Sequence, residues 1–452
     1  MYWPKSWPYE SAETLRPMKQ CKTAAIRAVK RRDAGGCGAA VPDWAFHAND
    51  EAVLDALATG RHGESLREYF GTAAYEQLCV QAASAKKLKR AGGPRVLIIP
   101  GIMGSRLGGS NRGVPKTGSR SVLWIDPIRI GAGRLTDLKL PSAKSIRPMG
   151  VLLFSYARLK LQLDIAGFDA MFFPYDWRRG IDELGAALAS TIAAGGKPVM
   201  LIAHSMGGLI ARVATKRLPK RCIRKLILLG TPNRGSYAPV QALRGTYPFV
   251  RKLARLDLRH TPEQLAQKVF CTFPGIYQLL PPPRPGSKID LLDSGQWPRV
   301  GPQPDATLLA RVAAVRALLA APDARMTHIV GVNRETVVAV RRTVTGFEYS
   351  LSANGDGTVP VAMASLPRLK SYFIDESHGN LANNSRVISA ILDLLRRGRT
   401  RELKRRFVPR RGRLTRIDDA GLRSFGGGKI DWRRLDSARR EAALMELDAT
   451  AD

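Results

Sequence analysis

The sequence predicts an α/β fold with a mostly parallel, doubly wound sheet. From residue 95 onward, short apolar runs alternate with loops and with longer amphipathic segments. This alternation is typical of buried parallel strands covered by helices. The segments expected to be helices, from their apolar period, are residues 152–166, 181–193, 207–217 and 385–395. The runs expected to be strands are residues 95–99, 169–173, 199–203, 225–229, 327–332 and 371–374.

The chain divides into three segments of different character. Residues 1–93 are predicted to be a helical N-terminal region that ends in a linker at Gly92-Gly93-Pro94. Residues 94–396 hold the strands and helices, and a β-hairpin is expected over residues 336–352. Two long insertions, at about residues 105–150 and 235–322, are interpreted as lids or substrate caps. Residues 397–452 are predicted to form a basic C-terminal extension.

The charge of the chain is unusual. Its 452 residues include 72 Lys and Arg against 38 Asp and Glu, which gives a formal net charge of +34. Residues 396–416 alone hold eleven basic residues and one acidic residue, Glu402, and we interpret them as an extended basic arm. Such a field attracts polyanions. An anionic membrane surface and nucleic acid both remain open as partners, and so does a simple solvated tail.

No cofactor or metal is indicated by the sequence. The five cysteines show neither the spacing of a disulfide framework nor that of a zinc site. No uncharged apolar run approaches the length of a membrane span, and the N-terminus lacks the apolar core of a signal peptide. We therefore expect a cytoplasmic protein, in peripheral contact with a membrane or exported without a cleavable signal. The oligomeric state is not indicated.

The most informative stretch surrounds Ser205. An apolar strand leads into Ala203-His204-Ser205-Met206-Gly207, and a helical segment follows. Small residues two before and two after the serine permit the strained turn that presents a nucleophile at the end of a strand. The alternative is that Ser205 merely caps the helix. Because the strand, the small residues and the helix occur together, we predict that Ser205 is a catalytic nucleophile.

A second glycine-containing loop follows the strand at residues 95–99. Pro100-Gly101-Ile102-Met103-Gly104 stands where a hydrolase of this architecture presents a backbone N–H to the oxyanion. We predict Ile102 as one oxyanion donor and Met206, directly after the nucleophile, as the other. A dinucleotide-binding loop is the alternative, but the chain has no GxGxxG motif there.

An acid and a base follow the nucleophile in the expected order. Asp356 lies between two glycines after the predicted hairpin, and His378 is the only histidine beyond it. Ser, Asp and His in this chain order are typical of α/β-hydrolases. Asp356 alone would be an ordinary turn residue, and His378 makes it a candidate acid. We expect His204 to point to the other side of the turn and His328 to be a core residue of a strand.

Four motifs together resemble one family. They are Pro100-Gly101-Ile102-Met103-Gly104-Ser105, Pro174-Tyr175-Asp176-Trp177-Arg178, Ala203-His204-Ser205-Met206-Gly207-Gly208 and Gly355-Asp356-Gly357-Thr358-Val359-Pro360, with His378 following. Over residues 95–396 the chain is similar to a bacterial member of the lecithin:cholesterol acyltransferase-like (LCAT-like) family of α/β-hydrolases.

The resemblance implies both an activity and a set of roles. It implies acyl transfer from a glycerophospholipid to water or an alcohol through an acyl-serine, with Ser205, Asp356 and His378 as the triad. It also implies that Trp124 lies beside the acyl pocket, and we expect Asp176 and Arg178 to be structural. An esterase or lipase acting on neutral or small esters remains an alternative, as does a non-catalytic scaffold that binds polyanions. The disulfide that staples the lid in secreted animal members has no counterpart, since no cysteine lies between Cys79 and Cys222.

Overall fold

The computed structural model describes residues 44–88, 92–109, 121–142, 144–283, 289–409, 414–424 and 427–448. The first part of the predicted N-terminal region, residues 1–43, lies outside these ranges, as do residues 410–413 of the predicted basic arm. All described residues belong to one compact unit that begins at Pro42.

The core of this unit is a six-stranded parallel sheet of order β11-β8-β7-β6-β1-β5. Each predicted strand is present, with its ends moved by at most two residues. The strands are β1 (Arg95–Ile99), β5 (Asp169–Phe172), β6 (Val199–His204), β7 (Ile223–Leu229), β8 (Met326–Val332) and β11 (Lys370–Asp375). The central strand β6 is buried along its whole length, as a strand covered on both faces must be.

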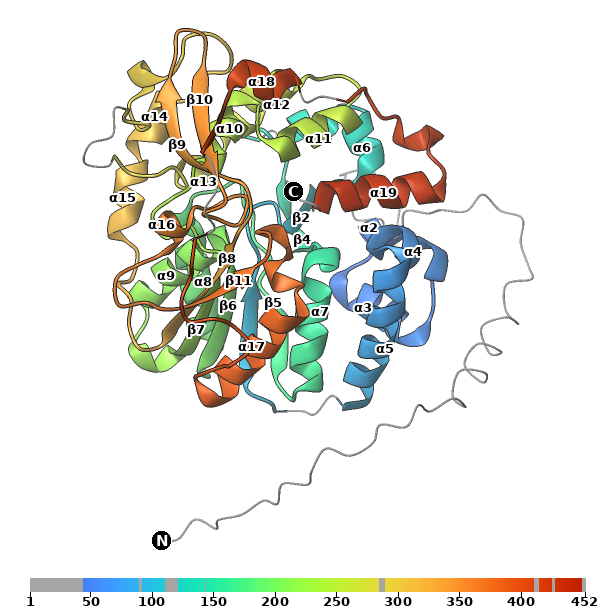
Figure 1. The fold of residues 1–452 in the computed structure, drawn as a ribbon. Helices are drawn as coiled ribbons and strands as arrows, with labels where there is room; N and C mark the ends of the chain where they lie inside the picture. Colours follow the sequence, from blue (N-terminus) through green and yellow to red (C-terminus); the bar gives the residue numbers. More distant parts are fainter. Residues whose placement is uncertain are drawn as a thin grey trace. The chain divides into compact units, whose positions relative to one another are not determined.

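Helices cover both faces of the sheet, as Figure 1 shows. On one face α8 (Ile181–Ala194) packs against α9 (Met206–Arg217), and on the other α7 (Leu153–Ile165) packs against α17 (Ser385–Arg397). The buried residues of α17 fall on one side, because they recur at helical spacing. Together with the parallel sheet, this arrangement confirms the predicted α/β-hydrolase fold.

The first insertion forms a small antiparallel sheet of order β3-β2-β4. Its strands are β2 (Ser105–Gly109), β3 (Ser121–Trp124) and β4 (Ile146–Val151). Between β3 and β4 the chain forms α6 (Pro127–Gly131) and the 3-10 helix η1 (Arg134–Leu138). Asp126 caps α6 by accepting from the backbone N–H groups of Ile128 and Arg129.

The second insertion is mostly helical. Its described helices are α10 (Ala238–Arg244), α11 (Pro248–Leu256), α12 (Pro262–Lys268), η3 (Phe270–Thr272), α13 (Pro274–Tyr277), η4 (Ser294–Gln296), α14 (Ala306–Ala310) and α15 (Val312–Ala317). After β8 follows the predicted hairpin, made of β9 (Thr336–Arg342) and β10 (Phe347–Ser352). Three short elements complete the region around the sheet: η2 (Lys220–Cys222), α16 (Val361–Ala364) and η5 (Gly379–Ala382).

Four helices precede the sheet and pack against α7 and the first insertion. They are α2 (Trp44–His47), α3 (Asp50–Thr59), α4 (Gly63–Phe70) and α5 (Thr72–Leu88), and α5 lies against α7. Arg106 of β2, almost fully buried, donates to the carbonyl of Phe46 at 3.0 Å and contacts Asp50 at 2.7 Å. The described part of the predicted N-terminal region therefore shares its core with the hydrolase fold.

The described part of the basic C-terminal segment also folds onto the unit, although an extended arm was expected. β12 (Thr415–Asp418) pairs with β10, and α18 (Asp419–Ser424), η6 (Trp432–Arg434) and α19 (Ser437–Asp448) follow. Leu403 and Trp432 are buried, and the Phe407 ring stacks on Phe373 of β11. These few apolar side chains anchor a segment whose composition is otherwise polar and basic.

No helix within the described ranges is long and apolar enough to cross a membrane.

Candidate active site

Ser205 occupies a strained turn between β6 and α9. Its φ angle is +53°, in the left-handed region that few residues other than glycine adopt. A Cβ on Gly207, two residues after Ser205, would lie 2.4 Å from the Pro100 carbonyl oxygen, and a Cβ on Gly208 would lie 1.9 Å from the Thr231 hydroxyl just after β7. Glycine is therefore required at both positions at the start of α9.

The structure brings the three predicted triad residues together. His378 Nε2 lies 2.8 Å from Ser205 Oγ, and His378 Nδ1 lies 2.8 Å from Asp356 Oδ2. All three side chains are buried. The other carboxylate oxygen of Asp356 accepts from the backbone N–H groups of Thr358 at 3.0 Å and Val359 at 2.7 Å. The carboxylate is thus held by its own loop while it orients the imidazole.

A glycine makes room for the contact between acid and base. Gly230 follows β7 with a φ angle of +54°, and a Cβ there would lie 3.0 Å from His378 Nδ1 and 3.2 Å from Asp356 Oδ2. Any larger residue would press on the bond between Asp356 and His378. The sequence analysis did not single out this position, because its importance depends on two residues more than a hundred positions away.

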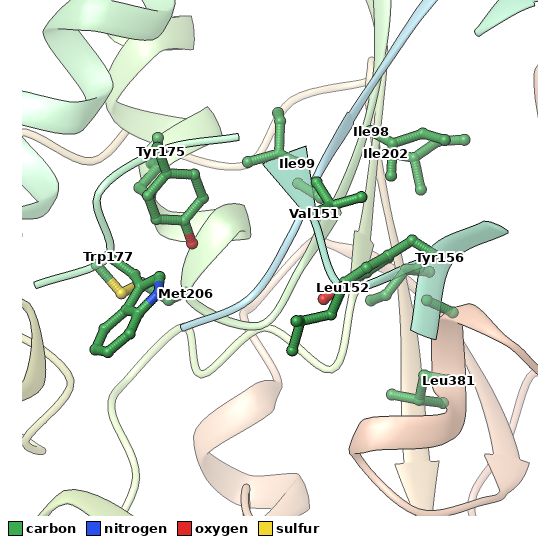
Figure 2. Packing of buried hydrophobic residues seen from close by; sticks show 14 of the residues in the cluster. Ile98, Ile99, Val151, Leu152, Tyr156, Tyr175, Trp177, Ile202, Met206 and Leu381 are labelled. Carbon is green, nitrogen blue, oxygen red and sulfur yellow. The ribbon is translucent and has the colours of Figure 1, made fainter. Parts of the chain in front are cut away.

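The predicted oxyanion loop is fixed by the Pro-Tyr-Asp-Trp-Arg motif. The Tyr175 hydroxyl donates to the Pro100 carbonyl at 2.8 Å, and Trp177 Nε1 donates to the Ser105 carbonyl at 2.9 Å. Arg178 forms a bidentate salt bridge with Asp176, with N···O distances of 2.8 and 2.7 Å. This salt bridge makes the motif rigid. Ile102 lines the cavity beside Ser205, and Met206 is buried at the start of α9 next to Trp177 (Figure 2).

Sequence reasoning missed a second hydrogen-bonded network. His204 was expected to point away from the site, but its Nε2 lies 2.9 Å from the carbonyl oxygen of His378. Its Nδ1 lies 2.9 Å from the Tyr156 hydroxyl, which also accepts from the Gly101 N–H at 2.9 Å. Tyr156 comes from α7 and points toward the sheet in Figure 2.

The protonation of this network follows from its partners. A carbonyl oxygen only accepts, so His204 Nε2 carries the proton and Nδ1 accepts from Tyr156. Burial, together with the neighbouring His378, lowers the pKa of His204 to about 3. His204 is therefore neutral at physiological pH. Together with Tyr156, it links the oxyanion loop to the backbone of His378.

An apolar cavity of about 180 Å³ opens beside Ser205. The second insertion supplies a large part of its wall, whereas the first insertion supplies only Ile125. The first insertion and the start of α7 supply Ile125, Leu152 and Phe154, and the second supplies Ala238, Pro239, Ala242, Phe249, Ile276 and Leu279. The interpretation of the insertions as substrate caps remains a prediction, and their position against the cavity supports it.

Trp124 does not line this cavity, contrary to the expectation for a substrate-binding residue. Its side chain is fully buried, and its Nε1 donates to the Met103 carbonyl at 2.8 Å. Its ring contacts those of Trp177 and Phe249, with centroids 5.2 and 5.9 Å apart. Trp124 thus lies behind the wall that Ile125 and Phe249 form, and it supports the oxyanion loop.

His328 lies in the core, as predicted. It is fully buried in β8, where its Nε2 accepts from the Thr231 N–H at 3.1 Å, and burial lowers its pKa to about 3. Across the described ranges, no group of His, Cys, Asp and Glu side chains could hold a metal ion.

Residues 166–290 match the family model described as lecithin:cholesterol acyltransferase. Over this stretch, which is less than half of the chain, the sequence is similar to that family. The matched stretch includes Ser205, Met206 and the Pro-Tyr-Asp-Trp-Arg motif, whereas Ile102, Asp356 and His378 lie outside it. The family match and the geometry of Ser205, His378 and Asp356 support a serine hydrolase or acyltransferase.

Three solved structures are similar to parts of this chain. A chain of the Tle4–Tli4 complex is 14% identical over 67% of this chain and 98% of its own length, with a TM-score of 0.47. Bacillus licheniformis lipase BlEst2 in mature form is 15% identical, with coverages of 64% and 86% and a TM-score of 0.30. Phospholipase PlaB from Legionella pneumophila is 15% identical, with coverages of 68% and 60% and a TM-score of 0.31. At these identities the likeness concerns the fold alone. No curated protein matches the sequence.

Proposed function

We propose that this LCAT-like chain cleaves acyl esters of glycerophospholipids through an acyl-Ser205 intermediate that water or an alcohol then resolves. The main support for this proposal is the chain of hydrogen bonds from Ser205 through His378 to Asp356, which lies beside an apolar cavity. An acyl chain fits such a cavity, because its burial there removes apolar surface from water.

The reaction begins with proton transfer to His378. Nε2 accepts the proton of Ser205 Oγ as the oxygen attacks the ester carbonyl, and Asp356 stabilises the resulting imidazolium. The N–H groups of Ile102 and Met206 stabilise the negative oxygen of the tetrahedral intermediate. His378 then protonates the leaving alcohol. In the second half, His378 takes a proton from water or from an acceptor alcohol, which attacks the acyl-serine and releases Ser205.

Replacement of the nucleophile tests this mechanism. We expect Ser205→Ala to lower the release of fatty acid from phospholipid by roughly 10⁴-fold or more, because the covalent route is lost. Mass spectrometry of products from mixed phospholipid vesicles, with and without an added alcohol, measures the effect and separates hydrolysis from transfer. An unchanged thermal unfolding midpoint serves as the control for folding. Substantial activity in a folded Ser205→Ala protein would exclude Ser205 as the nucleophile.

We also propose that the basic surface of the chain brings it into peripheral contact with anionic membranes. Basic residues near anionic lipid each contribute about 1 kcal/mol to binding, and the formal net charge is +34. Nucleic acid is the competing polyanion, because cationic segments bind phosphate of either origin. Cosedimentation with anionic and neutral vesicles, compared with DNA binding at the same salt concentration, separates the two.

A further inference from the structure

A second cavity adjoins the one that contains Ser205. It measures about 830 Å³ and lies between α11 and the C-terminal segment. Tyr247 lines both cavities, and so does the Asp356 loop, through Gly357 on one side and Thr358 on the other. The Tyr247 hydroxyl lies 3.3 Å from Thr358 Oγ1. The two cavities therefore meet at Tyr247 and the Asp356 loop.

Helix α11 presents different chemistry to the two cavities. Phe249 faces the cavity at Ser205, whereas Lys252 and Arg255 line the second cavity. Val250 and Leu253 are buried between them, which fixes the rotation of the helix. The helix thus separates an apolar compartment from a cationic one.

The charged groups that line the second cavity are mostly basic. They are Arg251, Lys252, Arg255, Arg416 and Lys429, with Glu335 as the only carboxylate. Backbone carbonyls orient some of these cations: Arg251 Nη2 donates to Arg423, and Lys429 Nζ to Ala254 and Asp257. A carbonyl dipole positions a cation without cancelling its charge. Neighbouring carboxylates offset part of this charge: Glu263 near Arg251, Glu348 near Arg416 and Asp257 near Lys429.

Arg251 and Lys429 are partly withdrawn from water, and this burial lowers the pKa of both because the charged form loses hydration. A bound anion would replace part of that lost hydration. The Nε of Arg251 is also buried and has no hydrogen-bond partner within the part of the chain that the structure describes. Guanidinium groups bind phosphate oxygens well, through planar arrays of donors.

We propose that this second cavity binds the phosphate of an anionic glycerophospholipid headgroup while the acyl ester lies at Ser205. The inference rests on the proposed function and narrows its substrate class. In such a lipid only the glycerol carbons separate the ester from the phosphate, which suits two compartments that share Tyr247. The C-terminal segment supplies Arg416 and Lys429, so part of the basic sequence serves the site from outside the region that resembles the family.

The test compares two pairs of substitutions that remove equal charge. Lys252→Gln with Arg416→Gln removes one cation from each wall of the second cavity. Lys197→Gln with Arg217→Gln removes two exposed cations beyond the opposite end of the sheet, since Lys197 precedes β6 and Arg217 ends α9. The measurement is the rate of fatty-acid release from phosphatidylglycerol relative to phosphatidylcholine. Both lipids carry the same acyl chains in neutral detergent micelles, with enough salt to screen surface charge.

We expect the cavity pair to lower the phosphatidylglycerol preference by roughly five- to tenfold, as the loss of two partly exposed charge contacts implies. The control pair should change it by less than about twofold and leave hydrolysis of p-nitrophenyl butyrate unchanged. Equal preferences in wild type and the cavity pair would overturn the inference. Absence of Ser205-dependent release from either lipid would instead overturn the proposed function itself.

A second experiment distinguishes a lipid headgroup from a free phosphate ester as the ligand of this cavity. Calorimetric titration with sn-glycerol 3-phosphate should give weak binding to wild type and still weaker binding to the cavity pair, alongside the altered lipid preference. Binding that depends on the cavity while the lipid preference does not change would overturn the assignment to substrate lipid.

Discussion

Two neutral side chains join the loops on either side of the nucleophile. Tyr156 holds the Gly101 N–H next to the proposed oxyanion donor Ile102, and His204 holds the carbonyl of His378. Neither residue touches the reacting atoms in the mechanism proposed above, so both are positioning residues. Their effect is geometric, because a displacement of either loop by a fraction of an ångström moves the oxyanion donor or the base.

Removal of the Tyr156 hydroxyl tests this positioning role. We expect Tyr156→Phe to lower kcat by roughly ten- to a hundredfold with little change in KM, because the bound ester loses alignment more than affinity. Tyr277→Phe is the matched control. Tyr277 is also fully buried, and its hydroxyl also makes two hydrogen bonds, to the Cys271 carbonyl and from the Asp305 N–H.

Steady-state kinetics and thermal unfolding of both variants separate the two roles. If the Tyr156 hydroxyl contributed only to stability, both variants would lose a similar amount of stability, and kcat of each would stay near the wild-type value.

Site residues could be predicted from the sequence where neighbouring residues in the chain form a recognisable pattern, and they were missed where their role depends on distant contacts. Ser205 could be predicted because a strand, a turn of small residues and a helix stand side by side in the chain. Tyr156 and Gly230 act across 48 and about 150 positions, and a single sequence contains no pattern for such contacts. The role of Trp124 was predicted from the family resemblance alone. The residue does lie near the site, but its side chain does not line the cavity.

At the scale of elements, the central strands were predictable because each is a continuous apolar run bounded by loops. The C-terminal segment was not, since its buried residues are sparse among basic ones. Its key residue is Asp419, which accepts from Arg244 of α10 at 2.9 Å and from the Tyr349 hydroxyl at 2.7 Å. Nothing in the sequence distinguishes this carboxylate from the exposed Asp418 beside it.

We expect Asp419→Asn to destabilise the fold by about 3–5 kcal/mol, because it leaves the fully buried Arg244 guanidinium without its countercharge. Urea unfolding measures the change. Asp436→Asn is the control, since its carboxylate pairs with Arg439 at 3.6 Å in an exposed position, where an ion pair contributes at most about 1 kcal/mol. Similar unfolding midpoints for the two variants would mean that the contact of β12 and α18 with α10 contributes little.

At the scale of the whole molecule, the net charge follows from the sequence alone, but the structure is needed to say which groups have shifted pKa values. His204 lies at the active site at the end of β6, and His328 lies in β8, which β7 separates from β6; burial is the largest cause that lowers the pKa of each to about 3. An unfolded histidine titrates near pH 6.5. Each therefore stays neutral in the folded protein at a pH where the unfolded chain binds a proton.

This difference makes stability depend on pH with a definite sign. Because the folded pKa of each histidine lies below its unfolded value, its contribution is fully present above about pH 6.5 and decreases as the pH falls toward 3. Relative to pH 7.5, the two together should lower the free energy of unfolding by about 4 kcal/mol at pH 5. Urea unfolding at half-unit steps between these values measures the slope. His328→Gln should halve it, whatever its effect on stability at pH 7.5. An unchanged slope in that variant would show that His328 is not neutral in the folded protein at pH 5.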